Sequence, residues 1–230
     1  MKGISINIQT KITLIGKPDK AKWLENYVKH NIKSKGTGIP DIRQIIKEVN
    51  KKYKLTERCI SEQIELLNDL MSQEYTEDKL SAILYLQLFW KNKNESQTLN
   101  IISKWFDNNL ITDWNVCDWI CVRVLTPLVD NYTKPTLTEL KKWNNNKNLW
   151  KARASLVPLA QSKSINQHEK LVREFSIKLI KREERFSKTS VGWVMREYSK
   201  VDIDFVLKFL FDFNNYTTKE VIKNATKYLN

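Results

Sequence analysis

Two short segments of this chain combine tryptophan with charged side chains at helical spacing. In the first, Trp114 and Asp118 lie four residues apart, so that the indole and the carboxylate share one face of a helix. In the second, Trp193 is followed by Arg196 and Glu197 at similar spacing. Indoles beside charged groups on a helical surface are costly unless a ligand binds there, so both segments are candidates for a binding or catalytic site.

The alternative is that these tryptophans belong to the core. Aromatic residues at helical spacing are usually buried, and taken alone the Trp114–Asp118 spacing favours a buried indole beside a solvated carboxylate. A separate apolar stripe, however, runs along the same segment and can face the core in their place: Val116, Ile120, Val124 and Leu128. That stripe leaves Trp114 and Asp118 free to line an exposed surface.

Two further features accompany these segments. Gly192 inside a helix costs about 1 kcal/mol relative to alanine, which indicates close approach by another helix or by a ligand. Between the two segments, Lys151 and Arg153 follow Trp150. Arg153 is either a phosphate contact or a structural ion-pair partner, and the sequence leaves both possibilities open.

The chain is strongly basic. It has 39 Lys and Arg against 26 Asp and Glu, a net charge of +13, which attracts polyanions such as nucleic acid or an anionic membrane. The alternative is a lysine-rich solvated surface. No apolar run reaches transmembrane length, and residues 1–20 lack the apolar core of a signal peptide. No helix combines strong basicity with strong amphipathicity, so we expect a cytoplasmic protein without a membrane role.

No metal site or cofactor is expected. The cysteines Cys59, Cys117 and Cys121 are odd in number and lack metal-ligand spacing, so we expect them to be reduced. His30 and His168 are isolated in the sequence.

Helical periodicity recurs along almost the whole chain, and only 5 Gly and 5 Pro punctuate it. Asp202, Thr217 and Thr136 are candidate N-caps, and Pro127 and Pro158 should kink or end the helices that contain them. The expected helices are Asp19–Ile32, Pro40–Tyr53, Glu57–Met71, Glu77–Lys91, Glu95–Asn108, Trp114–Val129, Leu137–Asn145, Leu149–Ala160, Gln167–Glu184, Thr189–Ser199, Ile203–Phe213 and Lys219–Leu229.

A helix pair roughly every 35–45 residues predicts an all-α fold, an α-solenoid of HEAT-like repeats with a concave and a convex surface. An irregular helical bundle is the alternative. We expect one domain over residues 1–230, because no linker or low-complexity segment divides the chain. Residues 1–18 form an N-terminal arm or an irregular helix.

The segments described above resemble the motifs of the AlkD-type DNA alkylation repair family, HEAT-like glycosylases that release alkylated purines. In that family a tryptophan precedes the catalytic aspartate by four residues, as Trp114 precedes Asp118. A later Gly-Trp-x-Leu/Met-Arg-Glu-Tyr motif supplies a second sugar-facing tryptophan, matched by Trp193. This last motif is the most specific of the set.

Two other motifs extend the resemblance over nearly the whole chain. The family's Asn-Leu/Ile-Trp-x-x-Arg is matched by residues 148–153, which end in Arg153, and its opening Gly-Ile-Pro…Arg is matched by residues 38–43, which end in Arg43. The sequence also departs from the family. Asn115 stands where many members carry Asp, and residues before Asp19 do not match. The first departure leaves an active enzyme and a DNA-binding relative both open.

The resemblance implies a monofunctional glycosylase that hydrolyses the N-glycosidic bond of 3-methyladenine and 7-methylguanine in double-stranded DNA, without flipping the base. Asp118 would stabilise the oxocarbenium-like sugar and orient water, while Trp114 and Trp193 would cradle the deoxyribose. The DNA would lie in a concave basic groove. The expected DNA contacts are Arg153, Arg196, Lys151 and Arg43.

Two alternatives stay open at this point. One is a catalytically inactive relative that recognises bent or branched DNA, and the other is a HEAT scaffold that binds an acidic protein. The scaffold has no reason to keep Trp114, Asp118, Arg153 and Trp193 together, which favours repair. We expect a monomer, as is usual for short solenoids of this type.

Overall fold

The structure, a computed structural model, describes residues 1–29, 31–90 and 95–229. Over these ranges the chain is helical and contains no β-strand. It divides into two compact units, Met1–Asn94 with Asn100–Val124, and Glu95–Leu99 with Leu125–Asn230. Helix α6 (Glu95–Asp107) contributes its first residues to the second unit and the rest to the first.

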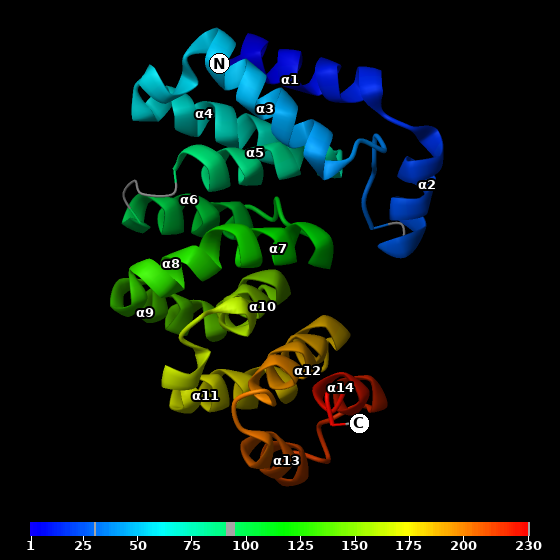
Figure 1. The fold of residues 1–230 in the computed structure, drawn as a ribbon, viewed down its shortest axis with the longest axis vertical. Coiled ribbons are helices and arrows are strands. Elements are labelled where there is room, and N and C mark those ends of the chain that lie inside the picture. The colour runs from blue at the N-terminus through cyan, green and yellow to red at the C-terminus, as the bar shows by residue number, and fades with distance from the viewer. Residues whose placement is uncertain (30, 91–94, 230) are drawn as a thin grey trace. The chain divides into compact units, whose positions relative to one another are not determined.

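Each of the other α-helices, labelled in Figure 1, lies within one unit. The first unit holds α1 (Lys2–Ile15), α2 (Pro18–Tyr27), α3 (Ile39–Tyr53), α4 (Ile60–Met71), α5 (Thr76–Phe89) and α7 (Trp114–Ile120), with a 3₁₀ turn, η1 (Leu55–Glu57). The second unit holds α8 (Thr126–Asn131), α9 (Thr133–Asn144), α10 (Leu149–Leu156), α11 (Glu169–Ile180), α12 (Arg185–Tyr198), α13 (Ile203–Asp212) and α14 (Lys219–Ala225), with the 3₁₀ turns η3 (Val157–Gln161) and η4 (Ile165–Gln167).

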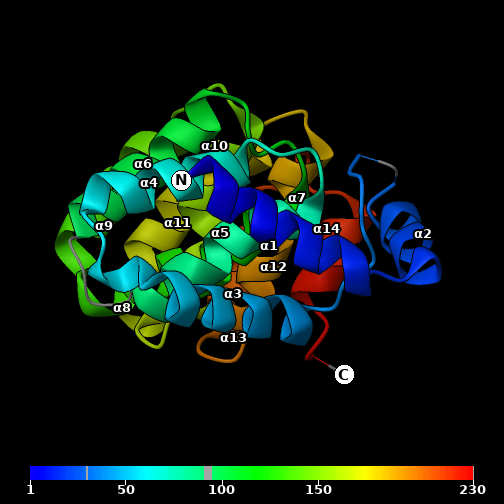
Figure 2. The same cartoon turned by 90° about the horizontal axis from the view of Figure 1, so that it is seen from above.

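Helix α5 is the centre of the first unit. It packs against α1, α3, α4 and α7, and α1, α3, α4 and α5 lie side by side in both views (Figures 1 and 2). Because neighbours surround it, α5 buries even its charged first turn, including Glu77 and Asp78. The Asp78 carboxylate pairs with the ammonium group of Lys35 at 2.7 Å, and Glu77 accepts hydrogen bonds from the loop that follows α2. Buried charges of this kind require such partners.

In the second unit, α12 is the most connected helix. It packs against α10, α11, α13, α14 and the turn η3, while α9 pairs with α10. Its buried face includes Val191, Val194 and Met195, which recur at the spacing of one helical stripe. The packing of α12 therefore determines how Trp193 is presented.

The largest difference between the expected and the observed helices occurs next to a proline. The predicted helix Trp114–Val129 is interrupted by a π-helical turn, η2 (Cys121–Leu125), between α7 and α8. Pro127 has no N–H to donate to the carbonyl four residues earlier, so regular α-helical bonding cannot continue through this point. Pro158 likewise ends α10 at Leu156 and begins a 3₁₀ turn, which confirms the break expected there.

Several helix boundaries also differ from those expected. Asp202 is confirmed as an N-cap, because its carboxylate accepts from the backbone N–H of Phe205 at 2.9 Å. Thr136 was wrongly expected to be a cap: α9 starts at Thr133, and the buried Thr136 hydroxyl donates to a carbonyl of α8 instead. The cap of α14 is Thr218 rather than Thr217.

At the N-terminus the chain forms the regular helix α1, with Ile4, Ile8 and Ile12 buried. The prediction that His30 is isolated, and the expected end of a helix at Lys91, lie outside the described residues. Nowhere in the described ranges is there a helix with the length and apolar character needed to cross a bilayer.

Candidate functional site

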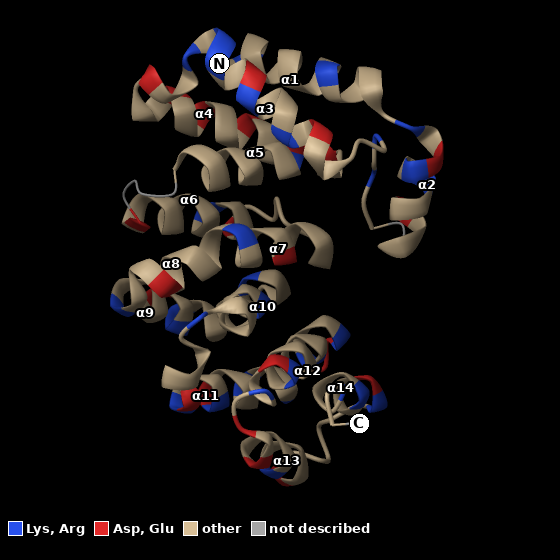
Figure 3. Cartoon of the chain, viewed as in Figure 1, with Lys and Arg blue, Asp and Glu red and all other residues tan. Residues whose placement is uncertain are grey.

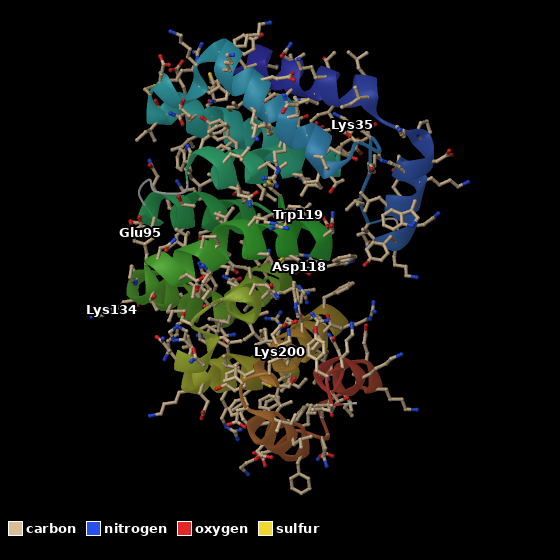
Figure 4. All side chains as sticks on the ribbon, in the orientation of Figure 1. Lys35, Glu95, Asp118, Trp119, Lys134 and Lys200 are labelled. Atoms are coloured by element: carbon tan, nitrogen blue, oxygen red, sulfur yellow. The ribbon has the colours of Figure 1, made fainter. Side chains whose placement is uncertain are left out.

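Helix α7 carries the first half of the candidate site. Asp113 caps it, since its carboxylate accepts a hydrogen bond from the backbone N–H of Val116 at 2.9 Å. Val116 and Ile120 are buried, whereas Trp114 and Asp118 are half-buried, as the apolar stripe in the sequence predicts. Asp118 projects from α7 next to Trp119 in the chain (Figure 4). The carboxylate and the indole therefore lie on the side of α7 that the core leaves open.

Helix α2 adds two aromatic side chains beside Trp114. The ring of Tyr27 meets the Trp114 indole edge to face, with centroids 5.2 Å apart and an interplanar angle of 74°. Tyr27 in turn stacks on Trp23 of the same helix, with ring centroids 5.3 Å apart and an interplanar angle of 6°. Although large and apolar, Trp23 and Tyr27 are 64% and 57% exposed. These three rings form a continuous aromatic surface that leads away from α7.

Sequence analysis missed Trp23 and Tyr27. Their local signal is the four-residue spacing of two aromatic residues in a helix that contains several lysines. Such a spacing is far more often a buried stripe. Only the contact with Trp114, a residue distant in the sequence, identifies the pair as part of this surface.

The base of α7 is electrostatically unusual. The pKa of Asp113 is raised from 3.8 to about 6. Burial is the main cause and the charge of Asp118 acts in the same direction, while backbone hydrogen bonds and Lys79 act in the opposite direction. Lys79 donates to the carbonyls of Met71 and Leu110, both at 2.8 Å, and burial lowers its pKa. The first turn of the helix that carries Asp118 thus lies beside a buried carboxylate and a half-buried ammonium group.

Helix α10 carries the predicted DNA contacts Lys151 and Arg153. Asn148 caps this helix by accepting from the backbone N–H groups of Trp150 and Lys151, at 2.9 and 3.1 Å. Lys151 is buried, with its ammonium group 5.7 Å from the centre of the Trp143 ring. A phosphate that contacts Lys151 would have to reach it past the side chains that cover it.

Arg153 is also buried, and it links α10 to α12. Its Nη1 donates to the carbonyl oxygen of Phe186 at 2.6 Å and to the hydroxyl of Thr189 at 3.3 Å, both in the first half of α12. Arg153 therefore orients the helix that carries Trp193.

Helix α12 presents Trp193 from a tightly packed position. Trp193 is half-buried, and its indole Nε1 is buried without a hydrogen-bond partner among the described residues. A Cβ at Gly192 would lie 3.2 Å from the Cα of Val221, so the close neighbour that this glycine indicates is α14. The buried, unpaired N–H leaves Trp193 with a donor that a ligand or a water molecule can satisfy.

The other two predicted DNA contacts lie in different settings. The Arg196 guanidinium donates to Glu197 at 2.8 Å and to Asn224 at 3.2 Å, and lies 6.0 Å from the Tyr228 ring centre, so it is held within the second unit. Arg43 is half-buried on α3 in the first unit. Lysines and arginines occur on helices of both units (Figure 3), and the concave basic groove stays a prediction.

The structure brings the expected residues together in two sets. Trp114 and Asp118 share one face of α7 in the first unit, and Arg153 is bonded to the helix of Trp193 in the second. The convergence of the two sets on one duplex stays a prediction.

These features define a class, an all-helical repeat protein with paired aromatic and acidic side chains on helix faces that the core leaves open. The family model for DNA alkylation repair enzymes matches residues 8–229, and the chain belongs to this family. The resemblance drawn from the tryptophan motifs is thereby confirmed.

Among solved structures, a predicted DNA alkylation repair enzyme from Enterococcus faecalis is similar to this chain with a TM-score of 0.75 and 19% sequence identity. The match covers 93% of this chain and 96% of that protein, which confirms the predicted all-α repeat fold. No curated protein matches the sequence significantly.

Proposed function

We propose that this member of the DNA alkylation repair family is a monofunctional glycosylase that releases cationic alkylated purines, 3-methyladenine and 7-methylguanine, from double-stranded DNA. One observation carries the proposal: Trp114 and Asp118 share the open face of a capped helix, with Tyr27 against the indole. Alkylation at N3 or N7 makes the purine a cationic leaving group, so the reaction needs no general acid. It needs negative charge near the sugar and a correctly placed water molecule.

In the proposed reaction, the bond between C1′ and the purine nitrogen breaks, and its electron pair leaves with the purine. The departing base is then neutral, while positive charge develops on the sugar. The Asp118 carboxylate stabilises that charge and orients the water molecule that adds to C1′. The added water then loses a proton to solvent. The faces of Trp114 and Trp193 contact the cationic deoxyribose. The products are a free base and an abasic site in an uncut strand.

The proposed DNA contacts follow from the charge of the chain and from the family resemblance. Arg153 contacts a flanking phosphate, a group whose oxygens match the planar fork of a guanidinium, and Lys151, Arg196 and Arg43 add positive charge along the duplex. Because the alkylated base is labile by itself, recognition does not require flipping it from the stack. The protein acts without a metal or other cofactor, and as a monomer.

The direct test replaces Asp118 by asparagine, which keeps the size of the side chain and removes its charge. Release of 3-methyladenine and 7-methylguanine from N-methylnitrosourea-treated DNA should fall at least tenfold, about 1.4 kcal/mol of transition-state stabilisation, with duplex affinity nearly intact. Asp204→Asn, at an exposed position on α13, is the matched control and should release both bases at the parental rate. Equal excision by Asp118→Asn and the parent would remove Asp118 from the mechanism.

The same assay addresses a second candidate function, a catalytically silent relative that recognises distorted DNA. Asn115, in place of the aspartate that many relatives carry, is the observation that favours it. Such a protein would bind methylated duplexes and release neither base. Release of free base by the parent protein at a rate well above that of methylated DNA alone excludes it.

A further inference from the structure

A cavity of about 310 Å³ lies within the first unit, on the side of α7 next to the face that carries Trp114 and Asp118. It is open to solvent on one side and is lined by residues of α2, the loop before α3, α5 and α7. Most of its wall is apolar and aromatic, formed by Trp23, Leu24, Ile39, Leu80 and Trp119. The polar side chains of the lining are those of Lys20, Ser34, Thr37, Thr76, Glu77 and Asn115. This size, with a mainly apolar surface and a limited set of polar groups, is typical of a small-molecule site.

The polar groups of this cavity differ in how fully they are bonded. The carboxylate of Glu77 already has hydrogen-bond partners within the protein. It accepts from the hydroxyl of Ser34 at 2.6 Å and from the backbone N–H groups of Lys35 and Gly36, both at 2.9 Å. Asn115 has fewer partners. Its side-chain amide donates only a long hydrogen bond of 3.5 Å to the hydroxyl of Thr76, and the described residues offer no partner to its amide oxygen. A donor and an acceptor on one planar group therefore face the cavity wall largely unused.

The aromatic surface described above connects this cavity with the candidate catalytic face. Trp114 contacts Tyr27, Tyr27 stacks on Trp23, and Trp23 lines the cavity. On α7 itself, Asn115 and Trp119 lie one residue after Trp114 and Asp118, so the two faces adjoin. A flat heterocycle that leaves the deoxyribose can stay in contact with rings along this route.

We propose that this cavity binds the released base, and that Asn115 makes it selective for 3-methyladenine. This inference rests on the proposed function. Hydrolysis converts a cationic purine into a neutral one, and a neutral flat base suits an apolar, aromatic site. An asparagine carboxamide pairs in bidentate fashion with N6 and N7 of adenine. In 3-methyladenine that edge is free, whereas 7-methylguanine carries a methyl group on N7 and an oxygen at position 6.

Isothermal titration of the whole protein with each free base tests the proposal without DNA. We expect 3-methyladenine to bind and 7-methylguanine to bind at least tenfold more weakly. Asn115→Leu keeps the volume of the side chain and should weaken 3-methyladenine binding at least tenfold, about 1.4 kcal/mol. Asn108→Leu, at an exposed position that follows α6, is the control and should bind as the parent does. Equal affinity for the two bases would overturn the proposal, as would unchanged binding to Asn115→Leu.

Trp23→Ala is a second variant. Because Trp23 is 64% exposed, its replacement should not disturb the packing of the core. It removes one aromatic wall and should also weaken 3-methyladenine binding, while parental affinity in this variant would count against the cavity. In the excision assay, added 3-methyladenine should inhibit the parent more than added 7-methylguanine. Equal inhibition by the two bases would contradict the selectivity.

The outcomes distinguish a failure of this inference from a failure of the proposed function. They also distinguish binding of the released base from contact with a base that is still joined to DNA. Excision without any binding of free base overturns the cavity proposal alone. Binding of 3-methyladenine without excision leaves the cavity proposal and removes the glycosylase. If Asn115→Leu slows single-turnover excision but binds free 3-methyladenine with the affinity of the parent, then Asn115 contacts the base before it is released. The proposal as stated would then be wrong.

Discussion

Replacing Asp113 by asparagine should stabilise the protein at neutral pH, although Asp113 caps the helix that carries Asp118. Asparagine and aspartate are equally good N-caps, so the hydrogen bond to the N–H of Val116 is kept. What changes is the charge. Asp113 is 2% exposed, and its pKa is raised from 3.8 to about 6, which means that the folded state disfavours the ionised carboxylate.

The magnitude and its pH window follow from that pKa. A difference between 3.8 and about 6 corresponds to roughly 3 kcal/mol of stability that the parent loses as the pH rises through this interval. An uncharged asparagine does not lose it. Above pH 6, the free energy of unfolding of Asp113→Asn should therefore exceed that of the parent by up to about 3 kcal/mol, or roughly 6–12 °C in melting temperature for a chain of this size. The advantage should shrink as the pH falls from about 6 to about 4.

Thermal unfolding of both proteins between pH 4 and pH 8, followed by far-ultraviolet circular dichroism, measures this difference. Asp202→Asn is the control, because Asp202 caps α13 in the same way from a half-buried position. It should change the melting temperature by much less than Asp113→Asn. A lower melting temperature of Asp113→Asn at pH 7 would refute the reasoning, because it would mean that attraction to Lys79 outweighs the burial of the carboxylate. A difference that is independent of pH would refute it too.

Two further predictions concern the second unit. Arg153→Ala should remove the charged donor of the 2.6 Å hydrogen bond to the Phe186 carbonyl, which costs about 1–3 kcal/mol of stability. The same substitution should reduce the magnitude of the slope of log affinity for DNA against log salt by about 1. An unchanged slope in a salt titration would make Arg153 purely structural. Gly192→Ala should lower the free energy of unfolding by about 1 kcal/mol, because a Cβ 3.2 Å from Val221 overpacks α12 against α14 and outweighs the better helix propensity of alanine. Greater stability in urea denaturation would show that α14 moves aside.

The sequence by itself determined the local features of this protein. Helical periodicity, the cap at Asp202 and the break at Pro158 each depend on groups within a few residues of one another, so they can be read from spacing. The same holds for α7, where the stripe that includes Val116 predicts which face is buried and leaves Trp114 and Asp118 on the other. The family, too, was recognisable from motifs of this local kind.

The tertiary structure decided everything that depends on contacts between helices distant in the sequence. Spacing within α10 cannot tell whether Arg153 faces solvent, because its burial depends on α12, more than thirty residues later. The place of Tyr27 beside Trp114 and the raised pKa of Asp113 likewise arise from segments far apart in the chain. Burial and electrostatic environment are properties of the packed helices. They cannot be predicted from the local sequence of the residues that create them.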